Sequence, residues 1–124
     1  MKVVDIERTI FCDVDDTLVM HRKPDSMEST PVWPIDPATG ELVKVYRNAP
    51  MIKCLLEEKH RGSFVVVWSM GGWEWARNVL TALGIEDKVD LVMTKPFAYF
   101  DDKHVNEWLT YRVYIKPEVP YKRS

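Results

Sequence analysis

A short apolar run that ends in crowded carboxylates constrains the fold of this chain more than any other stretch. Residues 10–12 are apolar and β-prone, and Asp13, Asp15 and Asp16 follow them directly. Like charges this close repel one another, so a folded protein keeps them together when a cation offsets the charge. Active sites of open α/β sheets lie just beyond the carboxyl ends of their strands. The stretch therefore predicts a strand that opens onto a site, although an acidic turn with no further role is the simpler alternative.

The composition is ordinary for a globular protein and fits one domain. The 124 residues are 46% hydrophobic and 29% charged, and the net charge of -2 gives no general attraction to nucleic acid. The longest apolar run, residues 64–68, is too short for a secretory signal or a membrane span. Cys12 and Cys54 have no metal-type spacing and are expected to be reduced, buried and inert. We therefore expect a single domain over residues 1–124 in the cytoplasm, without membrane contact.

Apolar strands alternate with amphipathic helices along the chain. One helix is expected to begin at Asn48 and to end at Gly62, and a second is expected to end at Gly84, with Trp75 in its apolar stripe. Residues 63–68 are apolar without alternation, which is typical of a strand covered on both faces. The alternation of strands and helices predicts a parallel α/β sheet. Its strands are expected at residues 9–14, 63–68, 90–94 and 97–100.

The segment 20–47 has a different texture from the rest of the chain. It contains four prolines, and an irregular loop this long inside a compact domain is uncommon and often functional. Residues 42–46 alternate like a strand and are expected to pair with residues 18–20, forming a flap or β-hairpin over the end of the first strand. Further along, we expect a short helix near residues 105–109, an edge strand at 111–115 and a flexible tail at 116–124.

Each predicted strand ends in polar residues. Right-handed crossovers bring the carboxyl ends of parallel strands to one edge of the sheet, so these residues are expected to lie together. Solubility alone gives no reason for polar endings on four apolar strands. The endings are Asp13 with Asp15, then Ser69, then Lys95, then Asp101 with Asp102.

This ordered set resembles the haloacid dehalogenase (HAD) superfamily of phosphohydrolases. The family's first motif, hhhDxDxT, is matched by I-F-C-D-V-D-D-T at residues 10–17. Its second, an apolar strand ending in Ser or Thr, is matched by F-V-V-V-W-S at residues 64–69. Lys95 matches the third motif, and F-A-Y-F-D-D at residues 97–102 matches the fourth. The resemblance implies a Rossmann-like three-layer α/β domain with a central, mostly parallel sheet, a short flap and no cap domain.

The resemblance also implies a Mg²⁺-dependent phosphatase that forms an aspartyl-phosphate. Asp13 would be the nucleophile, and Asp15 would protonate the leaving oxygen and then deprotonate the attacking water. Mg²⁺ would be held by the Asp13 carboxylate, by the backbone carbonyl of Asp15 and by the acidic pair. In that pair, Asp102 is favoured as the direct ligand and Asp101 as a ligand through water.

Phosphate binding is assigned to the polar ends of the other strands. Ser69 would hydrogen-bond a phosphoryl oxygen, and Lys95 would pair with the phosphate and with the nucleophile. Gly71 permits the tight turn after Ser69 and gives room beside the phosphate. The alternatives are a helix N-cap for Ser69 and a solvated side chain for Lys95. Trp75 is expected in the core, and a substrate role for His21, near the active-site loops, is the less favoured interpretation.

Other classes of protein share parts of this pattern. A receiver-type signalling domain carries its acidic pair after the first strand and its Lys last, whereas Lys95 here precedes Asp101 and Asp102. A carbon–halogen hydrolase would not need Asp15. A non-catalytic or regulatory HAD-like binding module is the open alternative, although it would typically have lost a motif residue. The resemblance also implies that a member without a cap acts on a bulky phosphorylated substrate, such as a nucleotide or a polynucleotide end, or takes a cap from a partner subunit in a homo-oligomer.

Overall fold

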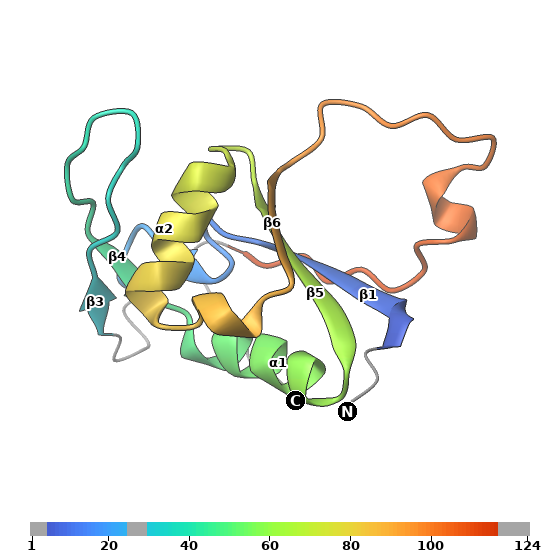
Figure 1. The fold of residues 1–124 in the computed structure, drawn as a ribbon, viewed down its shortest axis with the longest axis horizontal. Helices are drawn as coiled ribbons and strands as arrows, with labels where there is room; N and C mark the ends of the chain where they lie inside the picture. The colour runs from blue at the N-terminus through green and yellow to red at the C-terminus, as the bar shows by residue number, and fades with distance from the viewer. Residues whose placement is uncertain (1–4, 25–29, 117–124) are drawn as a thin grey trace.

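Three parallel strands form the sheet on which the site is built, in the order β1-β5-β6 (Figure 1). The structure is a computed structural model that describes residues 5–24 and 30–116. In the pairing of β1 with β5, Cys12 lies opposite Val67, and in the pairing of β5 with β6, Val67 lies opposite Val92. Three of the four predicted strands are thus confirmed, and β1 begins earlier in the sequence than predicted. They run over Asp5–Asp13 for β1, Ser63–Ser69 for β5 and Leu91–Thr94 for β6.

Two helices connect these strands, close to where the sequence predicts them. α1 spans Ala49–His60, with Pro50 in its first turn, where a proline costs no helical hydrogen bond. α2 spans Trp73–Leu83 and ends at Gly84, whose φ of 75° lies in the left-handed region that glycine adopts freely. Within the described segments, no helix is both long enough and apolar enough to cross a membrane.

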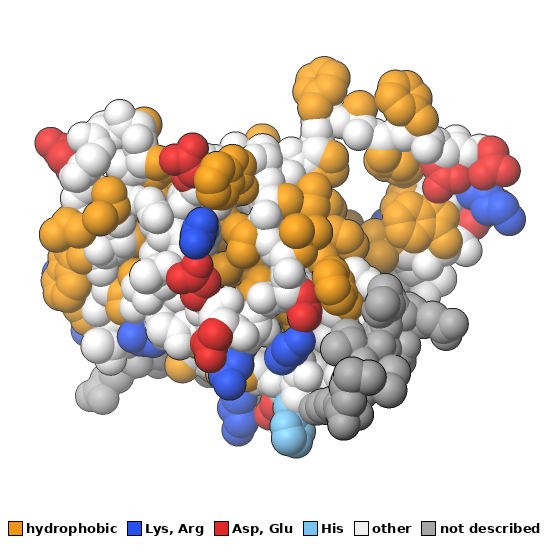
Figure 2. Space-filling view, in the orientation of Figure 1, with side chains coloured by type: hydrophobic (Ala, Val, Ile, Leu, Met, Phe, Trp, Pro, Cys, Tyr) orange, Lys and Arg blue, Asp and Glu red, His pale blue; other side chains and the backbone are white. Residues whose placement is uncertain are grey.

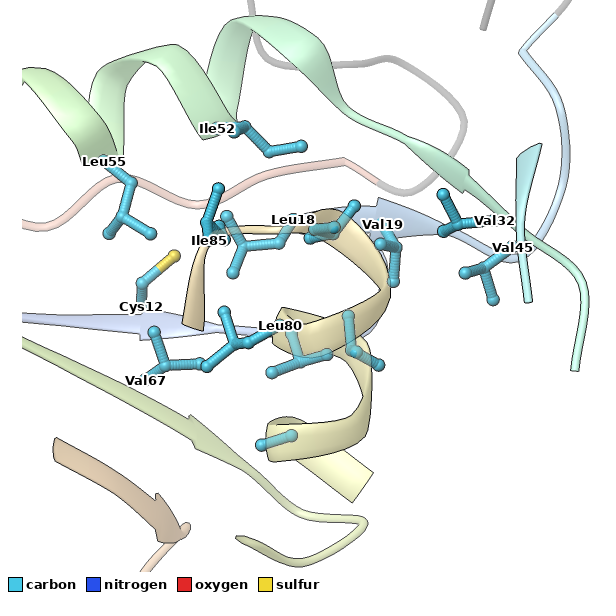
Figure 3. Close-up of a cluster of buried hydrophobic side chains, with 14 of the residues drawn as sticks. Cys12, Leu18, Val19, Val32, Val45, Ile52, Leu55, Val67, Leu80 and Ile85 are labelled. Carbon is cyan, nitrogen blue, oxygen red and sulfur yellow. The ribbon is translucent and has the colours of Figure 1, made fainter. Parts of the chain in front are cut away.

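The hydrophobic core lies between these helices and the sheet (Figure 3). Ile52 and Leu55 extend from α1, and Leu80 extends from α2. Their side chains belong to the same buried cluster as Cys12 of β1 and Val67 of β5. Since alternate strand residues point to opposite faces, both helices cover the face of the sheet that carries Cys12 and Val67.

The opposite face of the sheet carries the alternate strand residues. Phe11 and Trp68 stack there with ring centroids 4.5 Å apart, and Phe11 is 51% exposed. Both α-helices of the described residues pack on the other face. This part of the chain is therefore a mixed α/β domain with a three-stranded parallel sheet and two helices. The three-layer arrangement that the resemblance implies stays a prediction.

The segment 20–47 contributes a second, antiparallel sheet. Its predicted pairing with the residues after the first strand is confirmed, with strand order β2-β4-β3. The sheet is part of the domain and not a free flap, because Val19, Val32 and Val45 are buried in the common core (Figure 3). Its strands are β2 over Val19–Met20, β3 over Pro31–Val32 and β4 over Val45–Arg47.

The chain after β6 departs from the sequence prediction. Residues 97–100, predicted as a fourth strand ending in the acidic pair, form a loop without strand pairing, and Phe97 and Phe100 are fully exposed. Figure 2 shows hydrophobic side chains standing out along this loop. Only residues 95 and 96 separate β6 from the segment, whereas a parallel strand needs a crossover of about a dozen residues. The prediction of a parallel fourth strand is wrong for this reason.

The end of the described chain contains one short helix. The helix expected near residues 105–109 is confirmed as a 3₁₀ helix, η2, over Val105–Glu107. The edge strand predicted at 111–115 is wrong, since these residues have no regular secondary structure. A second 3₁₀ helix, η1 over Glu86–Lys88, precedes β6. Residues 117–124, most of the predicted tail, lie outside the described residues.

Candidate active site

The carboxyl ends of the three parallel strands meet at one edge of the sheet, where their polar endings place the candidate site. Ser69 ends β5 opposite Thr94 of β6. Lys95 follows Thr94, and its backbone N–H donates to the Ser69 carbonyl at 2.9 Å. Asp13 ends β1 on the other side of β5. The sheet thus brings together Asp13, Ser69 and Lys95, with Asp15 in the turn beyond β1.

The two oxygens of the Asp13 carboxylate have different partners. Lys95 Nζ lies 3.3 Å from Oδ1, and the Thr17 hydroxyl donates to Oδ2 at 3.2 Å. These two contacts fix the orientation of the carboxylate and offset its charge. The side chains of Asp13 and Lys95 are 32% and 31% exposed, so a ligand can reach both.

Backbone hydrogen bonds stabilise the turn after β1. The Val14 carbonyl accepts from the N–H groups of Thr17, Leu18 and Val19 at 3.0–3.3 Å. Asp16 has a φ of 57°, a left-handed conformation in which Asp is tolerated better than most residues. Its carboxylate accepts from the backbone N–H of His21 at 3.3 Å and so closes the turn. These contacts give Asp16 a role in the geometry of the turn.

The Asp15 carboxylate accepts hydrogen bonds from three separate parts of the chain. Trp75 Nε1 of α2 donates to both oxygens, at 3.0 and 3.2 Å. His21 Nε2 lies 2.7 Å from Oδ1, and the Ser69 hydroxyl donates to Oδ2 at 3.2 Å. Asp15 is therefore held from three sides while its side chain stays 34% exposed.

Sequence reasoning did not assign Trp75 or His21 to the site. Helical periodicity correctly predicts that Trp75 is buried, but it does not say where the indole N–H points. For His21, the available signal was its closeness in sequence to Asp15. Both assignments needed the tertiary structure.

The turn between β5 and α2 leaves little room for a side chain at position 71. The Ser69 hydroxyl is fully buried and accepts from the Gly71 N–H at 3.0 Å. A Cβ on Gly71 would lie 3.1 Å from Trp75 Cδ1 and 3.3 Å from Ser69 Oγ, which is tighter than ordinary packing. Gly71 therefore leaves space for the indole beside Asp15. In this arrangement Ser69 faces Asp15, and its binding of phosphate stays a prediction.

The acidic pair expected to complete a magnesium site lies in the exposed loop after β6. Asp101 accepts from the backbone N–H of Lys103 at 3.0 Å, and this hydrogen bond is the largest cause that lowers the pKa of Asp101 below its usual value. Among residues 5–24 and 30–116, no group of three or more His, Cys, Asp or Glu side chains is arranged to hold a metal ion. The predicted ligands Asp13, Asp101 and Asp102 are therefore not brought together as one group, and the magnesium site stays a prediction.

Cys12, the cysteine next to the site, has an unreactive thiol. Burial, reinforced by the neighbouring Asp13 charge, raises the pKa of the Cys12 thiol to about 12. Because the thiolate is the reactive form, Cys12 acts as a core residue. Cys54 is also a free thiol but is only half-buried, so the expectation that both are buried is wrong for Cys54.

Comparisons of the chain with family models, with curated proteins and with solved structures found no match. The likeness to the HAD superfamily therefore rests on the motif residues alone. The fold brings together two carboxylates: Asp13, which contacts the cation of Lys95, and Asp15, which accepts hydrogen bonds from Trp75 and His21. Such a pair suits covalent catalysis assisted by an acid and base.

Proposed function

We propose that the protein is a Mg²⁺-dependent phosphatase of the HAD type that hydrolyses a phosphomonoester through an aspartyl-phosphate. The observation that carries the proposal is the contact of Lys95 with Asp13 at 3.3 Å, beside an oriented Asp15. A cation at the nucleophile lets a charged carboxylate approach a charged phosphate. A Rossmann-like, three-layer HAD fold is part of the same proposal.

The reaction uses two displacements at phosphorus. In the first, an Asp13 oxygen forms a bond to phosphorus while the bond from phosphorus to the leaving oxygen breaks. The protonated Asp15 carboxyl gives its proton to that leaving oxygen. In the second, a water oxygen bonds to phosphorus, its proton passes to the Asp15 carboxylate, and the bond between Asp13 and phosphorus breaks to release inorganic phosphate. Lys95 offsets the charge on the phosphoryl oxygens and on Asp13 in both steps.

The proposed magnesium site would combine residues from two segments of the chain. Its ligands would be the Asp13 carboxylate and the Asp15 backbone carbonyl at the end of β1, together with Asp101 and Asp102, which lie in the exposed loop. The acidic pair would need a change in the position of residues 97–104 to approach Asp13, while Lys95 keeps its contact with the nucleophile. The steps above are therefore assigned to protein groups alone.

A bulky phosphate, such as a nucleotide or a polynucleotide end, is the proposed substrate. The side chains of Asp13 and Asp15 are each about one-third exposed, which suits a phosphate presented at an open surface. A hollow of about 390 Å³ lined by Arg47 and residues of α1 contains none of the predicted site residues, so we do not assign it to the substrate. A cytoplasmic location and a partner subunit that closes the site belong to the same proposal.

The first experiment measures hydrolysis of p-nitrophenyl phosphate with Mg²⁺. We expect turnover by the unmodified protein and a loss to background in Asp13→Asn, because the amide is no nucleophile. Asp87→Asn is the matched control, since Asp87 is 77% exposed and pairs only with Lys88 at 3.9 Å among the ion pairs of the described residues. Mass spectrometry after acid quenching should find a phosphoryl group on Asp13. The absence of turnover on nucleotides, phosphorylated oligonucleotides and sugar phosphates by a folded protein would overturn the enzyme proposal.

A non-catalytic binding module is the second candidate. The exposed position of Asp101 and Asp102 favours it, because a phosphatase of this type needs its acidic pair at the nucleophile. Calorimetry with the same panel of phosphorylated compounds separates the two candidates. Binding without release of inorganic phosphate, in the presence of Mg²⁺, would identify the module.

A further inference from the structure

Two side chains that lie outside the motif residues contact the carboxylate of Asp15. Trp75 comes from α2, and His21 follows β2 at the start of the segment that forms the second sheet. Both place a ring nitrogen within 3.0 Å of Asp15 Oδ1. The acid and base of the proposed reaction is thus fixed by the helix layer and by the second sheet.

The indole of Trp75 is built to reach Asp15. Trp75 is 8% exposed and belongs to the hydrophobic core, so its ring cannot turn freely. An indole N–H can only donate, and a buried one needs an acceptor, which Asp15 supplies. The absence of a side chain on Gly71 leaves the space that Trp75 Cδ1 occupies. The burial of the ring, the acceptor at Asp15 and the space at Gly71 therefore all favour the observed position of the Trp75 indole.

His21 holds the same oxygen from the solvent side. Its side chain is 43% exposed, and its own backbone N–H is bound by Asp16 at 3.3 Å. The backbone contact places the ring at the edge of the turn, where Nε2 meets Asp15 at 2.7 Å. His21 thus connects the second sheet to Asp15, the acid and base of the proposed reaction.

We propose that Trp75 and His21 are positioning residues that hold the Asp15 carboxyl in one orientation beside Asp13, ready to transfer a proton to the leaving oxygen. This inference rests on the proposed phosphatase function. Misplacing a group that takes part in proton transfer lowers the rate of that step and leaves substrate binding largely unchanged. Loss of either donor should therefore lower kcat much more than it changes KM.

The leaving group gives a readout that a purely structural role would not change. p-Nitrophenolate departs readily without protonation, whereas an alkoxide from a simple alkyl phosphate needs the proton from Asp15. Trp75→Phe keeps an aromatic ring and removes the N–H donor. We expect its kcat to fall about tenfold more for an alkyl phosphate than for p-nitrophenyl phosphate, a part of what general acid catalysis contributes. Trp68→Phe is the matched control, because Trp68 stacks on Phe11 and should show no such difference.

The exposed His21 provides a second pair of variants that leaves the core intact. His21→Ala should shift the ratio of the two kcat values in the same direction as Trp75→Phe. His21→Gln should recover part of the loss, because its amide nitrogen can donate from a position close to Nε2. Equal losses on both substrates in the Trp75 and His21 variants would overturn the inference.

A spectroscopic measurement tests the contact without any turnover. The indole N–H signal of Trp75 in a ¹H–¹⁵N spectrum is assigned by its disappearance in Trp75→Phe. Asp15→Ala should shift this signal toward the position of an unbonded indole and leave the signal of Trp68 in place. An unchanged Trp75 signal would overturn the positioning role. If the protein hydrolyses no phosphate but the signal shifts, the contact stands and the proposed function alone fails.

Discussion

Lys95 Nζ lies 3.3 Å from Asp13 Oδ1, although Asp13 ends β1 and Lys95 follows β6, two strands that are not neighbours in the sheet. β5 stands between β1 and β6, so the lysine side chain reaches across the end of the middle strand. The backbone N–H of Lys95 is anchored on the last residue of that strand, Ser69. The contact therefore depends on the whole parallel sheet and not on a local turn.

Lys95→Ala should lower kcat/KM for p-nitrophenyl phosphate by about 100-fold or more, which is the size of effect seen when one stabilising donor is lost from an active site. The measurement is steady-state kinetics with Mg²⁺ present. Lys88→Ala is the control, because Lys88 is exposed and its ion pair with Asp87 is long, at 3.9 Å. Equal activity of the two variants would contradict the role of Lys95.

Asn48→Ala should lower the free energy of unfolding by about 1–3 kcal/mol, the usual cost of leaving a buried polar group without its partner. Asn48 is fully buried and its Nδ2 donates to the Thr17 carbonyl at 2.8 Å, which joins the start of α1 to the turn that holds Asp13. Asn78→Ala is the matched control, since Asn78 binds the Ile35 carbonyl at a solvent-exposed site where water can replace it. Chemical denaturation of both variants measures the difference, and a larger loss in Asn78→Ala would contradict the prediction.

Asp90 should contribute to stability in a pH-dependent way. Burial raises the pKa of its carboxyl. Hydrogen bonds from Lys59 at 2.6 Å and from the Val65 N–H at 2.8 Å lower this pKa, and the net result is a pKa below the usual value. A folded-state pKa below the unfolded value stabilises the protein above about pH 4, and this contribution is lost as the pH falls through the folded pKa.

Asp90→Asn should therefore cost about 1–2 kcal/mol at pH 7, as expected for hydrogen bonds to a charged group. The difference from the unmodified protein should shrink toward pH 3, as followed by urea denaturation at both pH values. A difference that is constant or grows at low pH would contradict the assignment. Asp87→Asn, at an exposed carboxylate, should show little effect at either pH.

The loop after β6 should be the first part of the chain that chymotrypsin cuts. Phe97 and Phe100 are fully exposed in a segment without regular secondary structure, which is the preferred kind of site for proteolysis. Mass spectrometry of early fragments identifies the position, and first cuts inside α1 or α2 would contradict the prediction. If the acidic pair binds Mg²⁺ together with Asp13, millimolar Mg²⁺ should slow this cleavage. Asp102→Asn should remove the protection, whereas Asp87→Asn should keep it.

Cys12 should resist thiol reagents at neutral pH in the folded protein. Its pKa, raised to about 12 by burial and by the Asp13 charge, leaves almost no thiolate. In a Cys54→Ser variant, where Cys12 is the remaining thiol, Ellman's reagent should react only after the protein is denatured. Rapid reaction of the folded variant would show that the β1 core opens readily.

Local sequence patterns predict the regular elements well, because those patterns reflect burial. The unbroken apolar run of β5 and the apolar stripe of α2 both match the structure, and Gly84 ends α2 in the left-handed conformation. The same reasoning fails at residues 97–100, which are equally apolar but have too little chain before them to return to a parallel position. Hydrophobicity predicts a strand there, and chain connectivity prevents it.

The order of strands and helices along the chain already predicts that Asp13, Ser69 and Lys95 share one edge of the sheet, because parallel strands joined by right-handed crossovers align their carboxyl ends. Tertiary structure alone decided what holds Asp15, since the contacts of Trp75 and His21 depend on how α2 and the second sheet pack against the turn. It also decided where Asp101 and Asp102 lie, in a loop whose path no local pattern specifies. Strand ends follow from local burial and chain direction, whereas side-chain contacts between distant elements follow only from packing.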